Sequence, residues 1–374
     1  MENLGLNNDV LVGGRKFHVQ TNYSDIQQQV ISKVFLDGQV IDSKELTIEG
    51  DTSQENIEAN TQQLHQQLIT EMEVLYYICE KVKTVRHATS SNKLGLLFLQ
   101  RNLLKECIEQ FNLALEIEPQ FAEVYANLGK ALMMSNSYSE AVEVLNRGVE
   151  VAPSFADIRN YLGIAYLYER KFESSIDHLL QAIKLNENYI GAHFHLGVSY
   201  LAQSLSFDGE PRPSSEDIQG KALYHFDLAA KRVIDRQIPT FRRIMDLISK
   251  QSYKEAVDEF LNGSPKEMLT HFTNIENEFY LKFMYGGKGK DDAFIAEYVQ
   301  KLQDIITDHP HYADVRNSLG VANLIQCRNL FLKSLEEFRT ALKINPNFKK
   351  AEKNLKLAEN DGKGFLILLR AILK

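Results

Sequence analysis

Four Leu-Gly pairs recur at a constant interval of 34 residues along this chain. Their glycines are Gly95, Gly129, Gly163 and Gly197, and a leucine directly precedes each one. A strict period of this length indicates a repeat architecture, in which each unit buries its apolar face only against its neighbours. The period therefore predicts a stack of similar units whose main property is a long surface for binding other proteins.

Other residue types recur in the same frame when the first Leu-Gly pair is numbered as positions 7 and 8. Position 20 is small (Cys107, Ala141, Ser175), position 24 is large and apolar (Phe111, Leu145, Leu179), and position 32 is proline twice (Pro119, Pro153). Apolar residues three and four apart predict two amphipathic helices in each unit, which cross closely at the small residues. From about residue 88 to 202 the pattern resembles the tetratricopeptide repeat, a helix-turn-helix unit.

Beyond Gly197 the pattern weakens and then returns. Ala222, Phe226 and Ala229 supply positions 20, 24 and 27 of a fourth unit, delayed by an insertion at 204–217 that we expect to be a mobile loop because it contains glycine and prolines. Residues 237–270 and 271–310 suggest degenerate fifth and sixth units. Leu319-Gly320 restores the pattern, and Phe338, Ala341 and Pro346 follow in the places of positions 24, 27 and 32.

We therefore expect a mainly α protein. Its core would be an α-solenoid of about seven tetratricopeptide-like helix-turn-helix units, preceded by a small N-terminal antiparallel β module and a long connecting helix. The expected ranges are 1–50 for the β module, 51–87 for the connecting or capping helix, 88–203 for regular units 1–3 and the first helix of unit 4, 204–217 for the insertion, 218–346 for irregular units, and 347–374 for a C-terminal capping helix and an apolar tail helix.

The N-terminal module has the alternating pattern of strands. Residues 15–21 alternate, and residues 30–41 read as a hairpin with a tight turn at Asp37-Gly38. The module resembles the leader of uncharacterised bacterial repeat proteins, which implies a bacterial chain and no known activity. A helix from about Ser53 to Val85 follows, with an apolar seam at Leu64, Leu68, Met72, Leu75, Cys79 and Val82. We expect this seam to cap the first repeat; the alternative is a coiled-coil dimer contact.

The resemblance implies a concave groove lined by the first helix of each unit. Carried onto this chain, the partner-binding residues are Asn127, Lys130, Met133, Met134, Asn160, Tyr161, Ile164, Tyr168, Phe194, His195 and Val198. Such an apolar and aromatic groove suits an amphipathic helix or an extended apolar segment of a protein or peptide partner. Two alternatives are that the aromatic residues pack between units, or that the N-terminal helix or the insertion fills the groove. The family's carboxylate-binding clamp is not expected, because only Asn127 matches it.

The C-terminus raises a related question. A helix over 348–360 should be followed by a turn at 361–364 and by an apolar helix containing Phe365, Leu366, Leu368, Leu369 and Ile372. We expect this tail helix to fold back on the solenoid. The alternatives are that it docks on a partner, or that it lies on an anionic membrane surface.

Composition and motifs exclude several function classes. The net charge of −8 argues against nucleic acid as a partner. Three scattered cysteines and a polar N-terminus without a signal sequence predict a cytoplasmic protein. We expect no catalytic residues, no cofactor and no metal, because no histidine or cysteine set has ligand spacing and Gly286-Gly287-Lys288-Gly289-Lys290 lacks the rest of a phosphate-binding loop.

The sequence thus predicts a non-enzymatic interaction scaffold or adaptor that binds an apolar or helical segment of a partner protein in its concave groove. Contact with a membrane is not expected. The alternative is a self-assembling structural subunit, a homo-oligomer formed through the N-terminal sheet and the C-terminal apolar helix.

Overall fold

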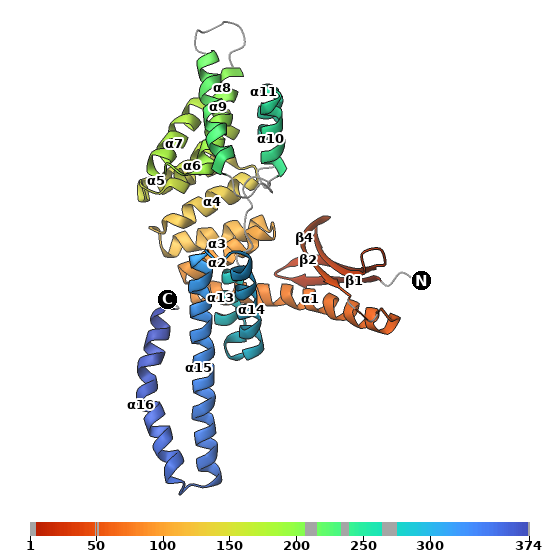
Figure 1. Cartoon of the computed structure of the whole chain (residues 1–374), viewed down its shortest axis with the longest axis vertical. Coiled ribbons are helices and arrows are strands. Elements are labelled where there is room, and N and C mark those ends of the chain that lie inside the picture. The colour runs from red at the N-terminus through yellow and green to blue at the C-terminus, as the bar shows by residue number, and fades with distance from the viewer. Residues whose placement is uncertain are drawn as a thin grey trace. The chain divides into compact units, whose positions relative to one another are not determined.

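The computed structural model describes residues 5–48, 50, 52–205, 215–232, 239–263 and 275–372 (Figure 1). The chain divides into two compact bodies, Met1–Glu278 and Phe279–Lys374, which we call the N-terminal and C-terminal bodies. Among the described residues, no helix is long and apolar enough to cross a membrane.

The N-terminal body begins with a four-stranded antiparallel sheet in the order β1-β2-β3-β4. Its strands are β1 Gly5–Val12, β2 Arg15–Ser24, β3 Gln29–Leu36 and β4 Gln39–Thr47. Asp37 (φ 49°) and Gly38 (φ 80°) both adopt left-handed conformations between β3 and β4, as the tightest hairpin turns require. The predicted hairpin is confirmed.

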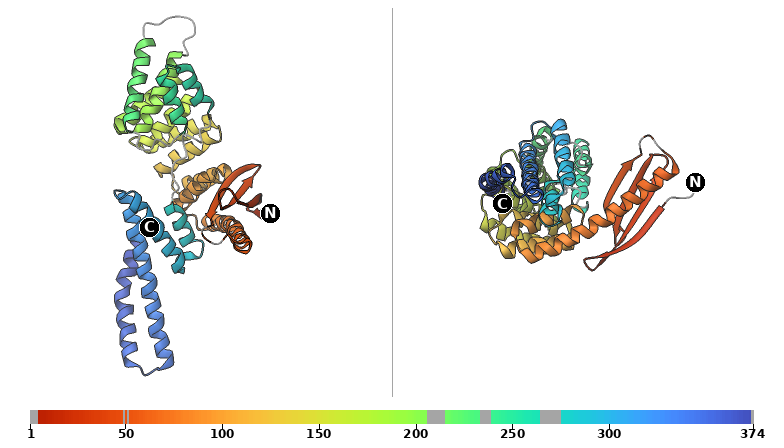
Figure 2. Two further views of the ribbon diagram at one scale, coloured as in Figure 1. Left: turned by 45° about the vertical axis from the view of Figure 1, so that its right-hand side comes forward. Right: turned by 90° about the horizontal axis from the view of Figure 1, so that it is seen from below.

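Helix α1, Gln54–Val85, covers one face of this sheet (Figure 2). It begins where the Ser53 side chain accepts a hydrogen bond from the backbone N–H of Asn56, which is a favoured N-cap. All six residues of the predicted apolar seam are buried. They pack against the strands and the next helix, α2, so the seam covers the sheet and the first repeat as the capping interpretation predicts.

Four regular repeats follow, each made of two helices. They are α2 Ala88–Gln100 with α3 Leu104–Ile117, α4 Ala122–Met134 with α5 Tyr138–Val151, α6 Ala156–Tyr168 with α7 Phe172–Leu185, and α8 Ile190–Leu205 with α9 Ser215–Arg232. In the first three, the turn between the helices contains one left-handed residue, respectively Asn102, Asn136 and Arg170. Residues 206–214 of the expected insertion lie outside the described residues. The predicted α-solenoid with its N-terminal β module is confirmed.

A fifth helical hairpin follows the four regular repeats. After it, the N-terminal body contains only the start of α13 among the described residues. It consists of α10 Pro239–Ser249 and α11 Tyr253–Asn262, and Gln251 (φ 58°) takes the left-handed turn conformation seen in the regular repeats. Residues 264–270 of the expected fifth unit lie outside the described residues.

The C-terminal body contains most of α13 Ile275–Met284, a 3₁₀ turn η1 Lys288–Lys290, and helices α14 Asp292–Asp308, α15 Ala313–Ile344 and α16 Lys349–Ile372. Stacked rings join α13 to α14, with Phe279 and Tyr298 centroids 3.8 Å apart. Two expectations were wrong here. The seventh unit is one continuous helix, α15, rather than a helical hairpin, and α16 runs unbroken through the turn expected at 361–364. A glycine costs a helix only about 1 kcal/mol, which packing against a second helix offsets.

Candidate interaction groove

The regular repeats hold their two helices together through the glycine at position 8. A Cβ atom placed on Gly95, Gly129 or Gly163 would lie 2.5 Å from the side chain at position 24 of the same repeat. On Gly197 it would lie 2.9 Å from Phe226, which confirms Phe226 as the delayed position 24 of the fourth repeat. This close crossing fixes the orientation of each first helix, and hence which of its residues line the concave face.

The hairpin α10–α11 covers the concave face of the third and fourth repeats. Helix α11 packs on α8, three helices earlier in the chain, whereas α5 and α7 pack on the helices that directly precede and follow them. Figure 1 shows α10 and α11 beside α8 and α9. The fifth hairpin therefore departs from the regular stacking and folds back over the groove.

Phe260 of α11 is the centre of this contact. Its ring lies 5.4 Å from that of Tyr168, 6.2 Å from that of Phe194 and 5.9 Å from that of His195. Phe241 of α10 adds a further ring contact, 4.9 Å from Phe194. Aromatic pairs at these separations add to the free energy gained from burial. Three of the residues predicted to bind a partner thus hold an aromatic side chain of the same chain.

The predicted groove residues of these two repeats are buried or half-buried. Ile164, Val198 and Phe194 are almost completely buried, and Tyr161 and Tyr168 are half-buried. Burial raises the pKa of Tyr161 to about 12 and also raises that of Tyr168. Both phenols are therefore neutral, and the groove here is an uncharged surface for apolar and aromatic groups.

His195 and Asn160 form a buried polar contact within this surface. The His195 ring donates through Nδ1 to Asn160 Oδ1 over 3.1 Å. Burial lowers the pKa of His195 to about 3, so the imidazole is neutral near pH 7. A neutral His195 gives the groove no positive charge at this position.

The groove becomes more polar toward the first two repeats. Asn127 donates to Asn92 Oδ1 over 3.0 Å, and Asn92 donates to Glu123 over 3.2 Å. Met133 and Met134 are buried. Burial lowers the pKa of Lys130, and no carboxylate of the described residues forms an ion pair with its ammonium group. A desolvated lysine on a concave face favours a ligand that brings an acidic group to it.

The N-terminal sheet is fixed to the first repeat by buried and half-buried charges. Arg15 of β2 donates to both carboxylate oxygens of Glu106 on α3, at 2.8 and 3.0 Å, and Tyr76 of α1 donates to the same carboxylate at 2.9 Å. Arg101 pairs with Asp42 of β4 at 2.9 Å. The sheet is therefore part of the repeat scaffold rather than a loosely attached module.

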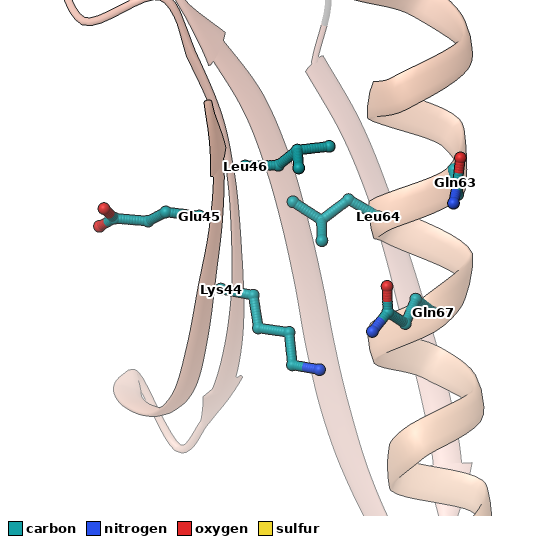
Figure 3. A pocket seen from close by; sticks show the side chains of 6 residues that line it. All are labelled: Lys44, Glu45, Leu46, Gln63, Leu64 and Gln67. Carbon is teal, nitrogen blue, oxygen red and sulfur yellow. The ribbon is translucent and has the colours of Figure 1, made fainter. Parts of the chain in front are cut away.

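A cleft of about 280 Å³ lies between β4 and α1 (Figure 3). Leu46 and Leu64 point toward each other across it, and Glu45 points away. Lys44 is the cationic group of the cleft, and its ammonium is paired with Glu71 at 2.5 Å. An open cleft whose charge is already neutralised offers little to a specific ligand, so we assign no site to it.

Three other candidate features of the sequence can be placed in the structure or lie outside it. In the described part of the chain, no three histidine, cysteine or acidic side chains converge as metal ligands. Lys288 of the glycine-rich segment pairs with Asp291 at 2.8 Å, and Asp291 caps α14. The side chains of Phe365, Leu366, Leu368, Leu369 and Ile372, predicted as a docking helix, lie outside the described residues.

The covering hairpin α10–α11 was not predicted as the occupant of the groove. The sequence suggested a degenerate fifth unit over 237–270, and the possible internal occupants that it indicated were the long N-terminal helix and the insertion. One signal in the sequence sets this hairpin apart: residues 237–270 lack the Leu-Gly pair of the regular repeats. This signal does not specify the direction in which the hairpin packs.

Comparison with known proteins identifies the repeat. Residues 101–162 match the family model described as "Tetratricopeptide repeat". No curated protein matches the sequence. Among solved structures, the chain is similar to MamA from Desulfovibrio magneticus RS-1, with 19% identity over 49% of this chain and 96% of that chain and a TM-score of 0.36. It is also similar to YrrB, described as a TPR protein with an unusual peptide-binding site (18% identity, 51% and 94% coverage, TM-score 0.34). Pseudomonas aeruginosa PilF is a third (16% identity, 61% and 95% coverage, TM-score 0.35).

Proposed function

We propose that this chain, which carries tetratricopeptide repeats, is a non-enzymatic interaction scaffold that binds a helical, apolar segment of a partner in the groove of its third and fourth repeats. One observation supports this most strongly: a helix with an aromatic residue already fits there. Helix α11 places Phe260 among Tyr168, Phe194 and His195. The partner's segment would take the place of α11, in the way that amphipathic helices occupy apolar grooves elsewhere.

The chemistry of the groove narrows the kind of segment that fits. Tyr161 and His195 are neutral, so the centre favours an aromatic or branched apolar anchor and disfavours a free carboxylate, which would be desolvated without a partner. Lys130 lies on α4 of the second repeat, and burial lowers its pKa. We therefore propose an amphipathic helix with an aromatic anchor and an acidic residue on the side that faces Lys130.

The compartment follows from the cysteines. All three are free, and Cys79 and Cys107 are buried inside helices. Free thiols and the absence of a disulfide framework are usual in reducing compartments. We propose that the scaffold works in the cytoplasm.

The test is site-specific photocrosslinking in the native host. A benzoylphenylalanine placed at Tyr168, inside the groove, is expected to crosslink a second protein, and mass spectrometry of the adduct should map the attachment to a helical segment. The matched control carries the same group at Tyr224, which is exposed on α9. If position 168 yields only adducts with this chain, or the same adducts as position 224, partner binding in this groove is wrong.

A second arm uses the pair Tyr161→Glu and Tyr168→Glu together. Two carboxylates in an uncharged, partly buried surface carry a desolvation cost of several kcal/mol, so partners captured through the groove should be lost. Recovery of the same partners by the double variant and the wild type would place the binding surface elsewhere on the chain.

A further inference from the structure

In the seventh repeat, the residues that correspond to positions 8 and 24 do not meet. In the first four repeats the position-24 side chain fills the space beside the position-8 glycine, and these four side chains are almost completely buried. No atom lies within 4 Å of a Cβ placed on Gly320, and Gly320 is exposed. Phe338, the corresponding large side chain, is only half-buried.

The cause is the continuity of α15. Gly320 and Phe338 both lie on this one helix, eighteen residues apart, whereas the corresponding pairs of the first three repeats are sixteen apart with a turn between them. Eighteen residues are five whole helical turns, so the two residues share a face but lie about 27 Å apart along the axis. They cannot touch each other within one chain while the helix is continuous.

The residue that would form the turn is held in the helix by its neighbour α14. Asn329 stands in the same local sequence, Arg-Asn-Leu, as the left-handed Asn102 of the first repeat. In α15 it donates to Asp292 Oδ1 over 3.1 Å, and Lys333 pairs with the same carboxylate. One contact lies at the place where a turn would form and the other lies one helical turn after it, and both stabilise the straight helix.

We propose that the Gly320 face of α15 binds a second copy of this chain, with two α15 helices antiparallel about a two-fold axis that passes beside this face at the level of residue 329. In that arrangement residue 320 of one copy stands opposite residue 338 of the other, and the reverse pair forms by symmetry. Each copy thus completes the other's seventh repeat, a domain-swapped pairing.

Exposed residues of α15 lie on or beside the Gly320 face, which is therefore open to a second copy. Gly320 and Cys327 are exposed on this face, and Leu330, which is 63% exposed, lies at its edge. The buried residues Ser318, Ala322 and Ile325 lie on the opposite side of the helix, where α14 packs. Helix α16 packs on α15. Phe338 is half-buried, which leaves part of its side chain free to contact a second copy.

The experiment is sedimentation equilibrium of the full chain from sub-micromolar to tens of micromolar concentration. The expected result is a dimer of twice the 42.8 kDa chain mass, weakened at least tenfold by Gly320→Phe, which fills the space needed by the partner's Phe338. The matched control is Gly220→Phe on α9, also a helical glycine with no atom within 4 Å of a placed Cβ; it should leave the dimer intact.

Two further arms keep the result decisive. Cys327 is the exposed cysteine of the three, and two copies paired at the level of residue 329 bring their Cys327 side chains close enough for crosslinking by a short bismaleimide.

The double change Asn329→Gly with Leu330→Ser favours a turn and should give a monomer whose seventh repeat closes on itself. A wild-type monomer at every concentration overturns the proposal. So does a dimer that Gly320→Phe leaves unchanged and that does not crosslink through Cys327. None of these readouts requires a partner in the groove, so they remain informative if the proposed function fails.

Discussion

The first four repeats and the seventh repeat use the same signature residues and reach different structures. In the second repeat, Gly129 and Leu145 meet because the left-handed Asn136 reverses the chain between them. In the seventh, Gly320 and Phe338 are separated because Asn329 remains helical. The pair meets where the turn forms. In the seventh repeat, two added residues lie between the pair, Asn329 contacts α14, and the pair stays apart.

The largest expected difference between these repeats lies at position 24. Leu145→Ala leaves a cavity against Gly129, and such core truncations cost about 2–5 kcal/mol of unfolding free energy. Phe338→Ala in a monomeric sample should cost less than half as much, because Phe338 is half-buried and has no contact with Gly320. Hydrogen exchange, measured helix by helix, checks both. Equal losses of protection in α4–α5 and α15 would show that the seventh repeat is closed in solution.

The regular repeats of this comparison were predictable from the sequence, and the open seventh repeat was not. The Leu-Gly period fixed the helices of the regular repeats, because the glycine and the position-24 residue pack within the same unit and depend on local spacing. The hairpin at Asp37-Gly38 and the seam of α1 were predictable for the same reason. The packing of Phe260 against Tyr168 was not predictable, because it joins residues far apart in the chain. It depends on the direction in which α10–α11 packs after the insertion. The continuity of α15 was missed because Leu319-Gly320, Phe338 and Ala341 indicated a helical hairpin. The hydrogen bond from Asn329 to Asp292 on α14 joins residues far apart in the chain, so the sequence did not indicate it.

Buried His195 should make the stability of the N-terminal body depend on pH, whereas α15 contains no histidine. His195 is buried with its pKa lowered to about 3, below the ordinary value of 6.5. Between these values the unfolded chain takes up a proton that the folded chain does not. Stability from this group is therefore complete above pH 6.5 and falls as the pH decreases, by up to about 1.4 kcal/mol for each pH unit.

His195→Gln isolates that contribution, because other histidines with lowered pKa values, such as His225, remain in both proteins. The variant should show a shallower loss of stability between pH 6.5 and 4.5 in denaturant titrations. Hydrogen exchange should place the wild-type loss in α8–α11 and leave α15 unchanged. If wild type and variant share one slope, His195 is not held neutral by burial.

A smaller difference is expected when alanine replaces the signature glycines. A Cβ at Gly163 would lie 2.5 Å from Leu179 and 3.2 Å from the Ser175 carbonyl oxygen. Such overpacking costs about 1–3 kcal/mol, more than the roughly 1 kcal/mol that alanine gains over glycine in a helix. Gly320→Ala meets no atom and should stabilise α15 in the monomer. Thermal unfolding of the two variants should therefore shift in opposite directions, and a loss at Gly320 would indicate that its face is covered.

The smallest change in stability is expected at two asparagines, one in the turn of a closed repeat and one in the open seventh repeat. Asn136 has φ 61°, a conformation that glycine adopts freely, so Asn136→Gly should change stability by less than about 0.5 kcal/mol. Asn329→Gly loses the hydrogen bond to Asp292 and places glycine inside a helix, which should cost the straight α15 about 1 kcal/mol. Because the same change also makes the turn easier, it should shift a dimeric sample toward a self-closed monomer, whereas Asn136→Gly should not. Chemical denaturation with sedimentation at matched concentrations measures both quantities. If the two variants behave alike, the state of Asn329 does not decide whether the seventh repeat is open, and the cause must lie in the two added residues alone.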